Sequence, residues 1–214
     1  MTLRIEVWSD IVCPWCYIGK RRLERALADF EHADEVEILW RSFQLDPTFP
    51  QGVSEPVYDS LAKKMNAPRE QVQAMTEQVQ QVAAQEGLRY DFAGGVMVNT
   101  FDAHRLTHLA REHGLGDAAH ERLMNAQLVQ GRVLNDVDTL VELAGEIGLD
   151  TERARTVLEG DEYADQVRAD IDDARRLGAT GVPFFVLDRA LGISGAQPLE
   201  VFSAALEKAH AQKG

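Results

Sequence analysis

The chain contains two cysteines, and both lie in the four-residue segment Cys13-Pro14-Trp15-Cys16. Before this segment, apolar residues at positions 3, 5 and 7 alternate with polar or amphipathic ones, which predicts a short strand that ends at Ser9-Asp10. After it, apolar residues recur at helical spacing from Leu23 to Phe30, which predicts a helix that begins near the motif. Pro14 suits the first turn, because an N–H group there would have no partner within the helix. A Cys-x-x-Cys motif in this context is moderately specific for redox chemistry.

The remaining patterns predict an α/β fold whose strands lie near both ends of the chain. A second strand is expected at about 36–42, which completes a strand, helix, strand unit. From 55 to about 178 the patterns are helical, and no strand is expected there. Strands are expected again at 182–187 and 190–193, followed by a closing helix at 198–210. A sheet assembled from the two termini, with helices inserted between its second and third strands, accounts for this order.

Glycines and helix-start residues predict where the inserted helices begin and end. Single glycines are each expected to end a helix, at Gly87, Gly114, Gly131, Gly148 and Gly160. Pairs of an asparagine with a proline or an aspartate are expected to start one, at Asn66 with Pro68, Asn99 with Asp102, and Asn135 with Asp138.

Size and charge exclude several classes of protein. With 214 residues and 45% hydrophobic content, the chain can bury the core of one large domain or of a domain that carries an insertion. Its formal net charge of -13 repels phosphate backbones and anionic lipids, so neither nucleic acid nor a membrane is expected as a partner. Arg4, Glu6 and Asp10 interrupt the first residues, so no signal peptide is expected, and no apolar stretch is long enough for a membrane span. We therefore expect a reducing cytoplasm, where a structural disulfide would be unusual.

Disulfide exchange needs one thiolate that attacks and a second thiol that resolves the mixed disulfide. The free N–H groups and the dipole at a helix N-terminus favour a thiolate at the first cysteine. Cys13 is therefore the expected nucleophile, and Cys16, one turn further into the helix, is the expected resolving thiol.

Three other interpretations of the cysteine pair carry less weight. A structural disulfide that closes so short a loop would remove little chain entropy. A structural zinc site would need a second ligand pair, and the chain has no other cysteine. The cysteines could also be two ordinary buried residues that happen to lie close together. Their position between a predicted strand and a predicted helix argues against such a coincidence.

Val182-Pro183 is a second candidate feature, because it opens a strand just after Gly181. Proline is acceptable at the first position of a strand and costly in the middle of a central one. A cis bond there would turn the Val182 backbone toward a neighbouring loop, where its N–H and C=O groups could pair with an extended thiol substrate. A proline that merely starts a strand explains the same residues, and both interpretations stay open.

Taken together, the motifs resemble those of the FrnE-type DsbA-family oxidoreductases of the thioredoxin superfamily. The resemblance covers almost the whole chain and rests on Trp8-Ser9-Asp10, Cys13 to Gly19, Trp40-Arg41-Ser42-Phe43, Asn99-Thr100 with Ala103 to Leu106, Gly181 to Val186, and Ser194 to Gln197. It implies a thioredoxin-like fold with a large all-helical insertion between the second and third strands. The thioredoxin-like domain would comprise 1–50 and 179–214, and the inserted helical domain would comprise 51–178.

The resemblance also implies roles for individual residues. Cys13 would be the nucleophile, Cys16 the resolving thiol, and Pro183 the cis-proline beside them. The residues expected to bind substrate in a cleft between the domains are Pro14, Trp15, Val182, His104 and Asn99.

The activity implied is that of a thiol–disulfide oxidoreductase or isomerase, with no bound cofactor. Its expected partners are thiol- or disulfide-containing proteins, and glutathione is a candidate thiol co-substrate. In a reducing cytoplasm the pair would rest as a dithiol, so reduction or isomerisation is expected rather than net oxidation, with a supporting role in oxidative stress. Homodimers are common among related folds, and the sequence leaves open whether this chain forms one. DsbA itself has a histidine between its cysteines where this chain has Trp15, which leaves the redox potential open.

Two alternative functions remain. Kappa-class glutathione transferases and 2-hydroxychromene-2-carboxylate isomerases belong to the same superfamily but place a serine at the start of the active-site helix. Cys13 and the retained Cys16 favour exchange over such a glutathione-dependent reaction on a small aromatic molecule. Ser194 and Gln197 could meet the glutamyl end of glutathione, although helix capping is the preferred interpretation. The second alternative is a non-catalytic holdase that binds apolar segments.

A few polar residues allow further hypotheses. His104, His108 and Glu112 fall four apart on one predicted helix and could share a metal, but this signal is weak. A charged helix face that includes Arg105 and Arg111 explains the same residues, so no metal site is predicted. Lys20 and Arg21 are expected to face water. Glu6 is a candidate proton acceptor for the resolving thiol, because related enzymes keep a buried acid on the first strand.

Overall fold

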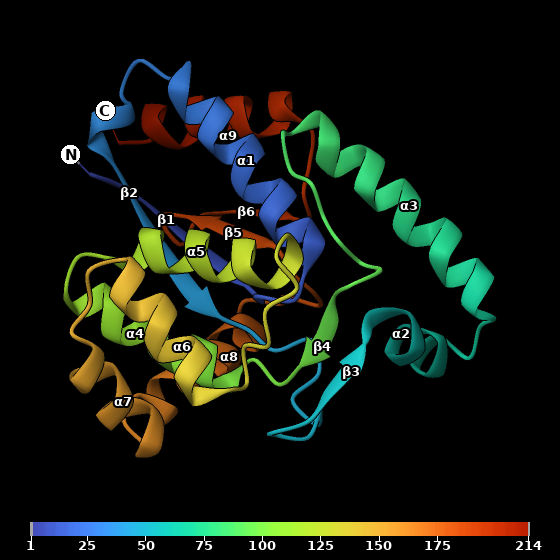
Figure 1. Cartoon of the computed structure of the whole chain (residues 1–214). Helices are drawn as coiled ribbons and strands as arrows, with labels where there is room; N and C mark the ends of the chain where they lie inside the picture. Colours follow the sequence, from blue (N-terminus) through green and yellow to red (C-terminus); the bar gives the residue numbers. More distant parts are fainter. Residues whose placement is uncertain (1, 214) are drawn as a thin grey trace.

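The computed structural model describes residues 2–213 and contains one larger sheet and one small sheet. The larger sheet has four strands in the order β2-β1-β5-β6, and it is assembled from the two ends of the chain (Figure 1). Its strands are β1 (Leu3–Ser9), β2 (Val36–Ser42), β5 (Phe184–Leu187) and β6 (Leu191–Ser194). β1 pairs in parallel with β2 and antiparallel with β5, and β5 pairs antiparallel with β6. The four predicted strands are therefore confirmed, with the bounds of β2 as expected.

Helices cover both faces of this sheet. α1 (Pro14–Ala28) and α9 (Leu199–Ala211) lie side by side on one face, where Ile5 and Val7 of β1 are fully buried with Phe185 and Phe202. On the other face, Trp8 of β1 packs against Ala174 of α8 (Ala164–Arg176) and Val186 of β5. The alternation along β1 thus places apolar residues on both faces, as a central strand requires.

The segment between β2 and β5 supplies most of the helices. They are α2 (Val57–Met65), α3 (Arg69–Gln85), α4 (Phe101–Glu112), α5 (Gly116–Leu128), α6 (Val137–Glu146), α7 (Thr151–Glu159) and α8, while a short 3-10 helix, Ala33–Glu35, precedes β2. The expectation that this insertion is all-helical is wrong, because β3 (Ser54–Pro56) and β4 (Val96–Val98) pair antiparallel in a sheet of their own. Three residues are too few to show the alternation by which a strand is recognised. The predicted domain boundaries at 50 and 179 stay a prediction.

Most predicted helix ends are confirmed, but one predicted helix start is wrong. Asn66 has a left-handed backbone (φ 49°) and ends α2, whereas Pro68 is the N-cap of α3, so Asn66 does not start the next helix. Gly160 is the C-cap of α7, with an extended backbone (φ -98°), whereas the other four predicted glycines have positive φ angles. Of these four, Gly131 lies two residues beyond the C-cap of α5, and the other three directly follow the C-cap of their helix. Asp136, next to the predicted Asn135, caps α6 by accepting a hydrogen bond from the Thr139 N–H.

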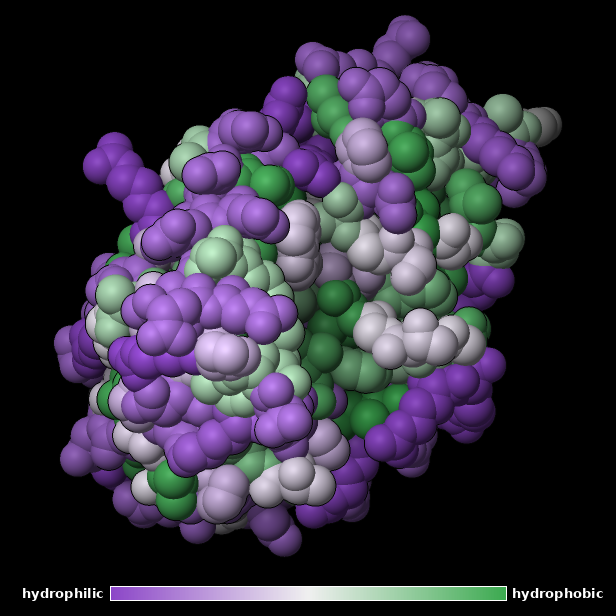
Figure 2. All heavy atoms as spheres, turned by 90° about the vertical axis from the view of Figure 1, so that its right-hand side faces the viewer, coloured by the Kyte–Doolittle hydropathy of each residue, from purple (hydrophilic) through white to green (hydrophobic). Residues whose placement is uncertain are grey.

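The elements α2, α3, β3 and β4 project from the rest of the molecule on one side (Figure 1). The face they form carries a hollow whose floor is apolar (Figure 2). Among the described residues, no helix is both long enough and apolar enough to cross a bilayer.

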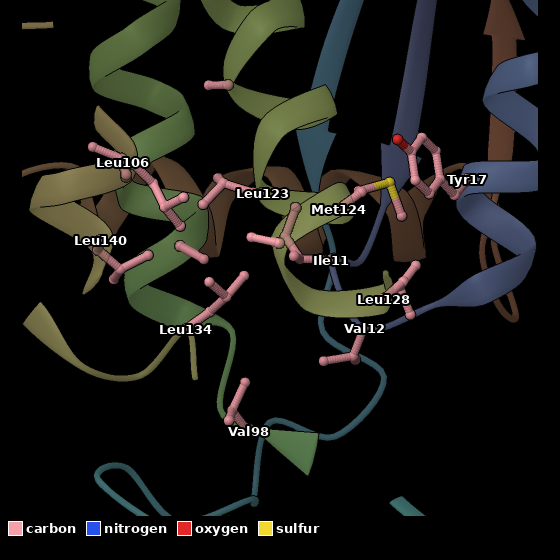
Figure 3. Close-up of a cluster of buried hydrophobic side chains, with 14 of the residues drawn as sticks. Ile11, Val12, Tyr17, Val98, Leu106, Leu123, Met124, Leu128, Leu134 and Leu140 are labelled. Atoms are coloured by element: carbon pink, nitrogen blue, oxygen red, sulfur yellow. The ribbon is translucent and has the colours of Figure 1, made fainter. Parts of the chain in front are cut away.

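The loop that leads into α1 shares its core with the inserted helices. Ile11 and Val12 of this loop and Tyr17 of α1 lie in one buried cluster with Leu123 and Met124 of α5 (Figure 3). This packing fixes the position of the dithiol against the insertion, since a close-packed core resists small displacements.

Candidate active site

The dithiol lies at the N-terminus of α1, directly after β1. Cys13 is the N-cap residue, Pro14 occupies the first turn, and the first turn carries no acidic side chain. The Cys13 N–H donates to the Asp10 carbonyl (3.0 Å), and the Cys16 N–H donates to the Cys13 carbonyl (3.1 Å). Both cysteines are free and buried. The positive end of the helix dipole therefore acts on Cys13 without a neighbouring carboxylate in the first turn to oppose it.

The Val182–Pro183 loop lies against Cys13. The peptide bond between these residues is cis, as anticipated, and Cys13 Sγ lies 3.7 Å from the Val182 carbonyl oxygen. Gly19 allows this approach, because a Cβ atom at that position would lie 3.0 Å from Pro183 Cγ and 3.1 Å from Phe185 Cζ. Residues 169 positions apart thus form one site.

Cys16 is the more protected of the two thiols. Burial raises its pKa well above the usual value, and the hydrogen bond and charge of Cys13 act in the same direction. Hydrogen bonds from the Ser9 side chain and the Asp10 backbone oppose this rise and do not overcome it. Cys16 is therefore a neutral thiol at physiological pH.

A cavity of about 730 Å³ begins beside the dithiol. Val12, Pro14 and Trp15 form the part of its wall that belongs to the α1 end, and Trp15 is 40% exposed. Its other apolar lining comes mainly from α2, α3 and the small sheet, and includes Leu45, Phe49, Leu61, Met65, Met75, Val79, Val82, Phe92, Val96 and Met97. This is the hollow visible in Figure 2.

The charged groups of this cavity are mainly acidic. Asp10, Asp46 and Asp91 contribute carboxyl groups, and Lys64 contributes the one ammonium among the lining residues. Lys64 Nζ lies 3.3 Å from Asp46 Oδ2, so its charge is already paired. The cavity therefore suits an apolar ligand better than an anionic one.

Comparison with known proteins agrees with this geometry. The sequence model of the family described as DSBA-like thioredoxin domain matches residues 4–207. The chain belongs to this family. It is 30% identical to the uncharacterised protein YwbO of Bacillus subtilis over the full length of both chains.

Two solved structures share the fold of the DsbA-like chain, at different levels of similarity. The crystal structure of a probable DsbA oxidoreductase from Streptomyces coelicolor has 49% identity and a TM-score of 0.94, with 98% of this chain and 90% of that one covered. The cytosolic disulfide reductase DsbM from Pseudomonas aeruginosa, solved with GSH, has 21% identity and a TM-score of 0.65, with coverages of 96% and 98%. The second likeness is one of fold alone.

Three of the five predicted substrate-binding residues surround the dithiol of this DsbA-like protein. Pro14 and Trp15 line the large cavity, and Val182 contacts Cys13. These positions agree with a role in substrate binding, and that role stays a prediction. His104 is in a different place from that expected. It is buried on α4 with Nε2 3.2 Å from Asp10 Oδ1, and it does not line the cavity, because α4 turns this face into the core.

Asn99 also lies outside the large cavity. Its side-chain amide donates to the Phe49 carbonyl (2.6 Å), and its Oδ1 accepts from the Phe101 N–H (2.9 Å) and from Gln44 Nε2 (3.1 Å). Asn99 therefore joins the loop after β2 to the start of α4, and it borders only a second, more polar hollow.

The histidines and the acid considered as a metal site have separate partners. His108 Nε2 lies 3.1 Å from both Ser42 Oγ and Asp170 Oδ2, and Glu112 accepts a hydrogen bond from Tyr163 (2.6 Å). Because His104 is held by Asp10, the structure does not bring these three residues to a common point.

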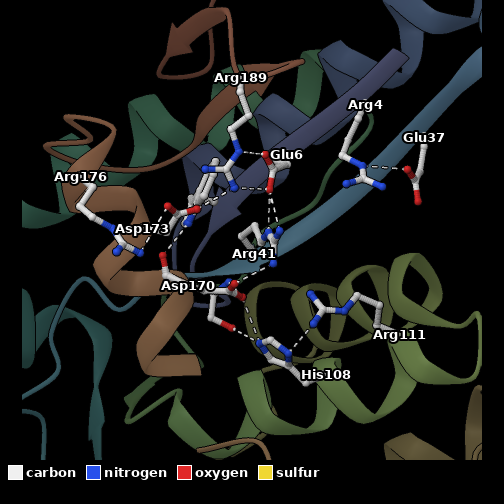
Figure 4. Close-up of polar contacts among 12 residues, drawn as sticks. Arg4, Glu6, Glu37, Arg41, His108, Arg111, Asp170, Asp173, Arg176 and Arg189 are labelled. Carbon is white, nitrogen blue, oxygen red and sulfur yellow. Dashed lines mark hydrogen bonds and ion pairs between the residues drawn. The ribbon is translucent and has the colours of Figure 1, made fainter. Parts of the chain in front are cut away.

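Glu6 is buried on the face of the sheet that α8 covers. Its carboxylate accepts from Arg41 (2.7 Å) and from Arg189 (2.7 Å), and Figure 4 shows both guanidinium groups directed at it. Glu6 therefore lies in a buried ion-pair network with two guanidinium groups, on the face of the sheet away from α1.

Two further interpretations are wrong. Lys20 does not face water: it is 2% exposed, with Nζ 2.6 Å from Asp117 and 2.9 Å from Glu24. Gln197 and Ser194 do not cap α9, whose N-cap is Pro198. The Gln197 side chain instead donates to the Ser194 carbonyl (2.7 Å).

Several polar residues near the thiols were not selected from the sequence. Tyr90 donates to the Pro14 carbonyl (2.7 Å), and burial, followed by the charge of Cys13, raises its pKa. Ser9 and Asp10 were noted as the end of a strand and as part of a family motif but were given no role at the thiols, and His120 carried no signal because nothing along α5 distinguishes it. Their importance comes from contacts between segments far apart in the chain.

Proposed function

We propose that this DsbA-like protein is a thiol–disulfide oxidoreductase that exchanges disulfides with protein substrates through Cys13 and Cys16. The observation that carries the proposal is the free thiol of Cys13 at the N-terminus of α1, beside the Val182 carbonyl and in hydrogen-bond contact with Cys16. Exchange chemistry needs an attacking thiolate and a second thiol within reach of it, and these two cysteines supply both.

In this mechanism the Cys13 thiolate attacks one sulfur of a substrate disulfide and releases the other sulfur as a thiolate. The Cys16 thiol then loses its proton and attacks Cys13 Sγ, which releases the reduced substrate and leaves a Cys13–Cys16 disulfide. An external thiol restores the pair to the dithiol. Isomerisation follows when a substrate thiol, rather than Cys16, attacks the mixed disulfide.

The cavity supports protein segments as substrates. Its apolar wall would hold apolar side chains next to the disulfide, while the Val182 backbone would pair with the extended chain. Glutathione carries two carboxylates, which the acidic groups of the cavity would disfavour. Glutathione remains a candidate for the thiol that restores the dithiol, as its presence in the DsbM structure suggests. The reducing cytoplasm is the compartment that fits this direction of exchange.

The apolar cavity also supports a holdase as a second candidate function. Binding of unfolded chains through this surface would need neither cysteine. A glutathione-dependent transferase or isomerase would need Cys13 but not Cys16.

Reduction of insulin by dithiothreitol tests these functions. Wild type should accelerate precipitation of the insulin B chain, whereas Cys13→Ser should be inactive and Cys16→Ser should accumulate mixed disulfide. If all three proteins leave the rate unchanged, disulfide exchange is excluded. Suppression of aggregation by the double variant Cys13→Ser/Cys16→Ser would then favour the holdase.

A further inference from the structure

The resolving step of the proposed reaction needs a proton acceptor inside the protein. Cys16 is 1% exposed, so bulk water does not reach its thiol directly. A thiol becomes an effective nucleophile only after it loses its proton. Glu6, the acid on the first strand, is held by two arginines and faces the other side of the sheet.

Ser9 connects Cys16 to a buried histidine. Ser9 ends β1 and is 1% exposed, and a hydrogen bond from its side chain acts to lower the pKa of the Cys16 thiol, which favours the thiolate. The same hydroxyl oxygen lies 2.8 Å from Nε2 of His120 on α5. The three side chains thus form a continuous path from the thiol, through the hydroxyl, to the imidazole.

His120 is built into the core as a neutral ring. It is 2% exposed and stacks on Trp40, with ring centroids 3.7 Å apart and an interplanar angle of 11°. Burial lowers its pKa well below the usual value, and the charges of Lys20 on α1 and His104 on α4 add to this effect. The ring therefore keeps a lone pair available for a proton near neutral pH.

The second ring nitrogen of His120, Nδ1, makes no hydrogen bond within the described part of the chain that would explain its place in the core. Within residues 2–213, His120 Nδ1 is a buried atom without a hydrogen-bond partner. Buried polar atoms without partners are rare in folded proteins and often mark a function. Stacking on Trp40 alone would be served by an apolar ring, which would place no unpartnered nitrogen in the core.

We propose that Ser9 and His120 carry the proton away from Cys16 in the resolving step, an inference that rests on the proposed function. The Cys16 S–H gives its proton to Ser9 Oγ while the Ser9 O–H gives its proton to His120 Nε2. The electron pair left on Cys16 Sγ forms the bond to Cys13 Sγ, and the bond between Cys13 and the substrate sulfur breaks. The substrate leaves as a thiolate, and the proton on His120 passes to that thiolate, or returns by the reverse path when an external thiol later reduces the Cys13–Cys16 disulfide.

The two steps can be observed separately with 5,5′-dithiobis(2-nitrobenzoate) and the reduced protein. Attack by Cys13 releases the first nitrothiobenzoate, and attack by Cys16 on the mixed disulfide releases the second. Stopped-flow absorbance resolves these phases in wild type, Ser9→Ala, His120→Phe and the double variant. Phenylalanine keeps an aromatic ring on Trp40 and removes the nitrogen, and Ser203→Ala on α9 serves as a control serine remote from the path.

We expect the first phase to be unchanged in every variant. The second phase should be about 100-fold slower in Ser9→Ala and in His120→Phe, the usual size of a general-base contribution. The double variant should be no slower than the slower single variant, because both changes interrupt one path. The variants should regain speed about tenfold per pH unit between pH 6 and 9, since solvent must then remove the proton, whereas wild type should be nearly independent of pH.

The outcomes separate the two proposals. A normal second phase in both single variants, or an equal slowing of both phases, would overturn the proton path and leave disulfide exchange intact. Absence of the first phase in wild type would overturn the proposed function itself. Near-ultraviolet circular dichroism and the intact first phase together show that a variant has folded.

Discussion

Gly19 provides a direct test of the contact between α1 and the Val182–Pro183 loop. Replacing Gly19 with alanine adds one methyl group in the second turn of α1. In the present backbone this group would lie 3.0 Å from Pro183 Cγ and 3.1 Å from Phe185 Cζ, closer than most carbon contacts. The substitution therefore changes the separation of the two halves of the site without touching either cysteine.

Two effects of opposite sign decide the change in stability. Alanine favours a helix interior over glycine by about 1 kcal/mol. Overpacking of a core by a methyl group typically costs about 1–3 kcal/mol. The neighbours cannot yield easily, because Phe185 is fully buried edge-to-face on Phe202 and the Pro183 carbonyl accepts from the Gly195 N–H (2.8 Å). We therefore expect Gly19→Ala to lower the free energy of unfolding by about 1–2 kcal/mol.

Urea denaturation followed by circular dichroism measures this loss, and insulin reduction measures the effect on the site. Activity should fall, since a misplacement of 1 Å can reduce a rate by about 100-fold. Gly116→Ala is the matched control, because its Cβ would meet its nearest neighbour, in Arg111, at 3.4 Å. The control should be neutral or gain about 0.4–1 kcal/mol. If Gly19→Ala were more stable than wild type and fully active, the argument from close approach would be refuted.

Three other predictions concern the thiols, an ion pair and the cavity. Iodoacetamide at pH 7 should modify Cys13 and spare Cys16 until the protein is unfolded, because burial raises the pKa of Cys16, and equal labelling by mass spectrometry would contradict this. Burial alone would raise the pKa of Asp170, but hydrogen bonds, first that of His108, lower it. Its ionised form therefore stabilises the fold above the unfolded pKa of about 4, and this stability is lost at lower pH. In Asp170→Asn the free energy of unfolding should therefore fall less steeply as the pH is lowered. If this dependence on pH were the same as in wild type, Asp170 would not be the source of the acid-sensitive stability. Val79→Glu in the cavity wall should slow insulin reduction but not the reaction with 5,5′-dithiobis(2-nitrobenzoate), and equal effects would exclude the cavity as the substrate site.

The elements of the larger sheet could be predicted because their signals are local. In β1 and β2 the alternation of side chains runs over seven residues each, long enough to be recognised. Pro14 marked the first turn of α1 because proline is pre-organised for that position. By contrast, β3 and β4 have three residues each, and pairing with a distant partner, not a periodic pattern, makes them strands.

The burial of polar side chains could not be predicted in the same way. Helical periodicity placed Lys20 on the polar face of its helix. The packing of α5 buries this side chain and adds the carboxylates of Asp117 and Glu121 to that of Glu24 on α1. His104 was expected at a groove, but whether a residue on α4 faces solvent or core depends on how that helix is rotated against its neighbours. A charged or polar group is buried where the fold supplies its partners, and those partners come from other segments.

The sequence by itself determined the strand, dithiol and helix order, the cysteine pair and the proline that lies beside it. These features depend on steric preferences and periodicities that extend over a few residues. Only the tertiary structure decided which groups meet the thiols: Val182 lies 169 positions from Cys13, and His120 lies 111 positions from Ser9. Such pairs are selected by the free energy of packing the whole chain, to which each short segment contributes only a small part.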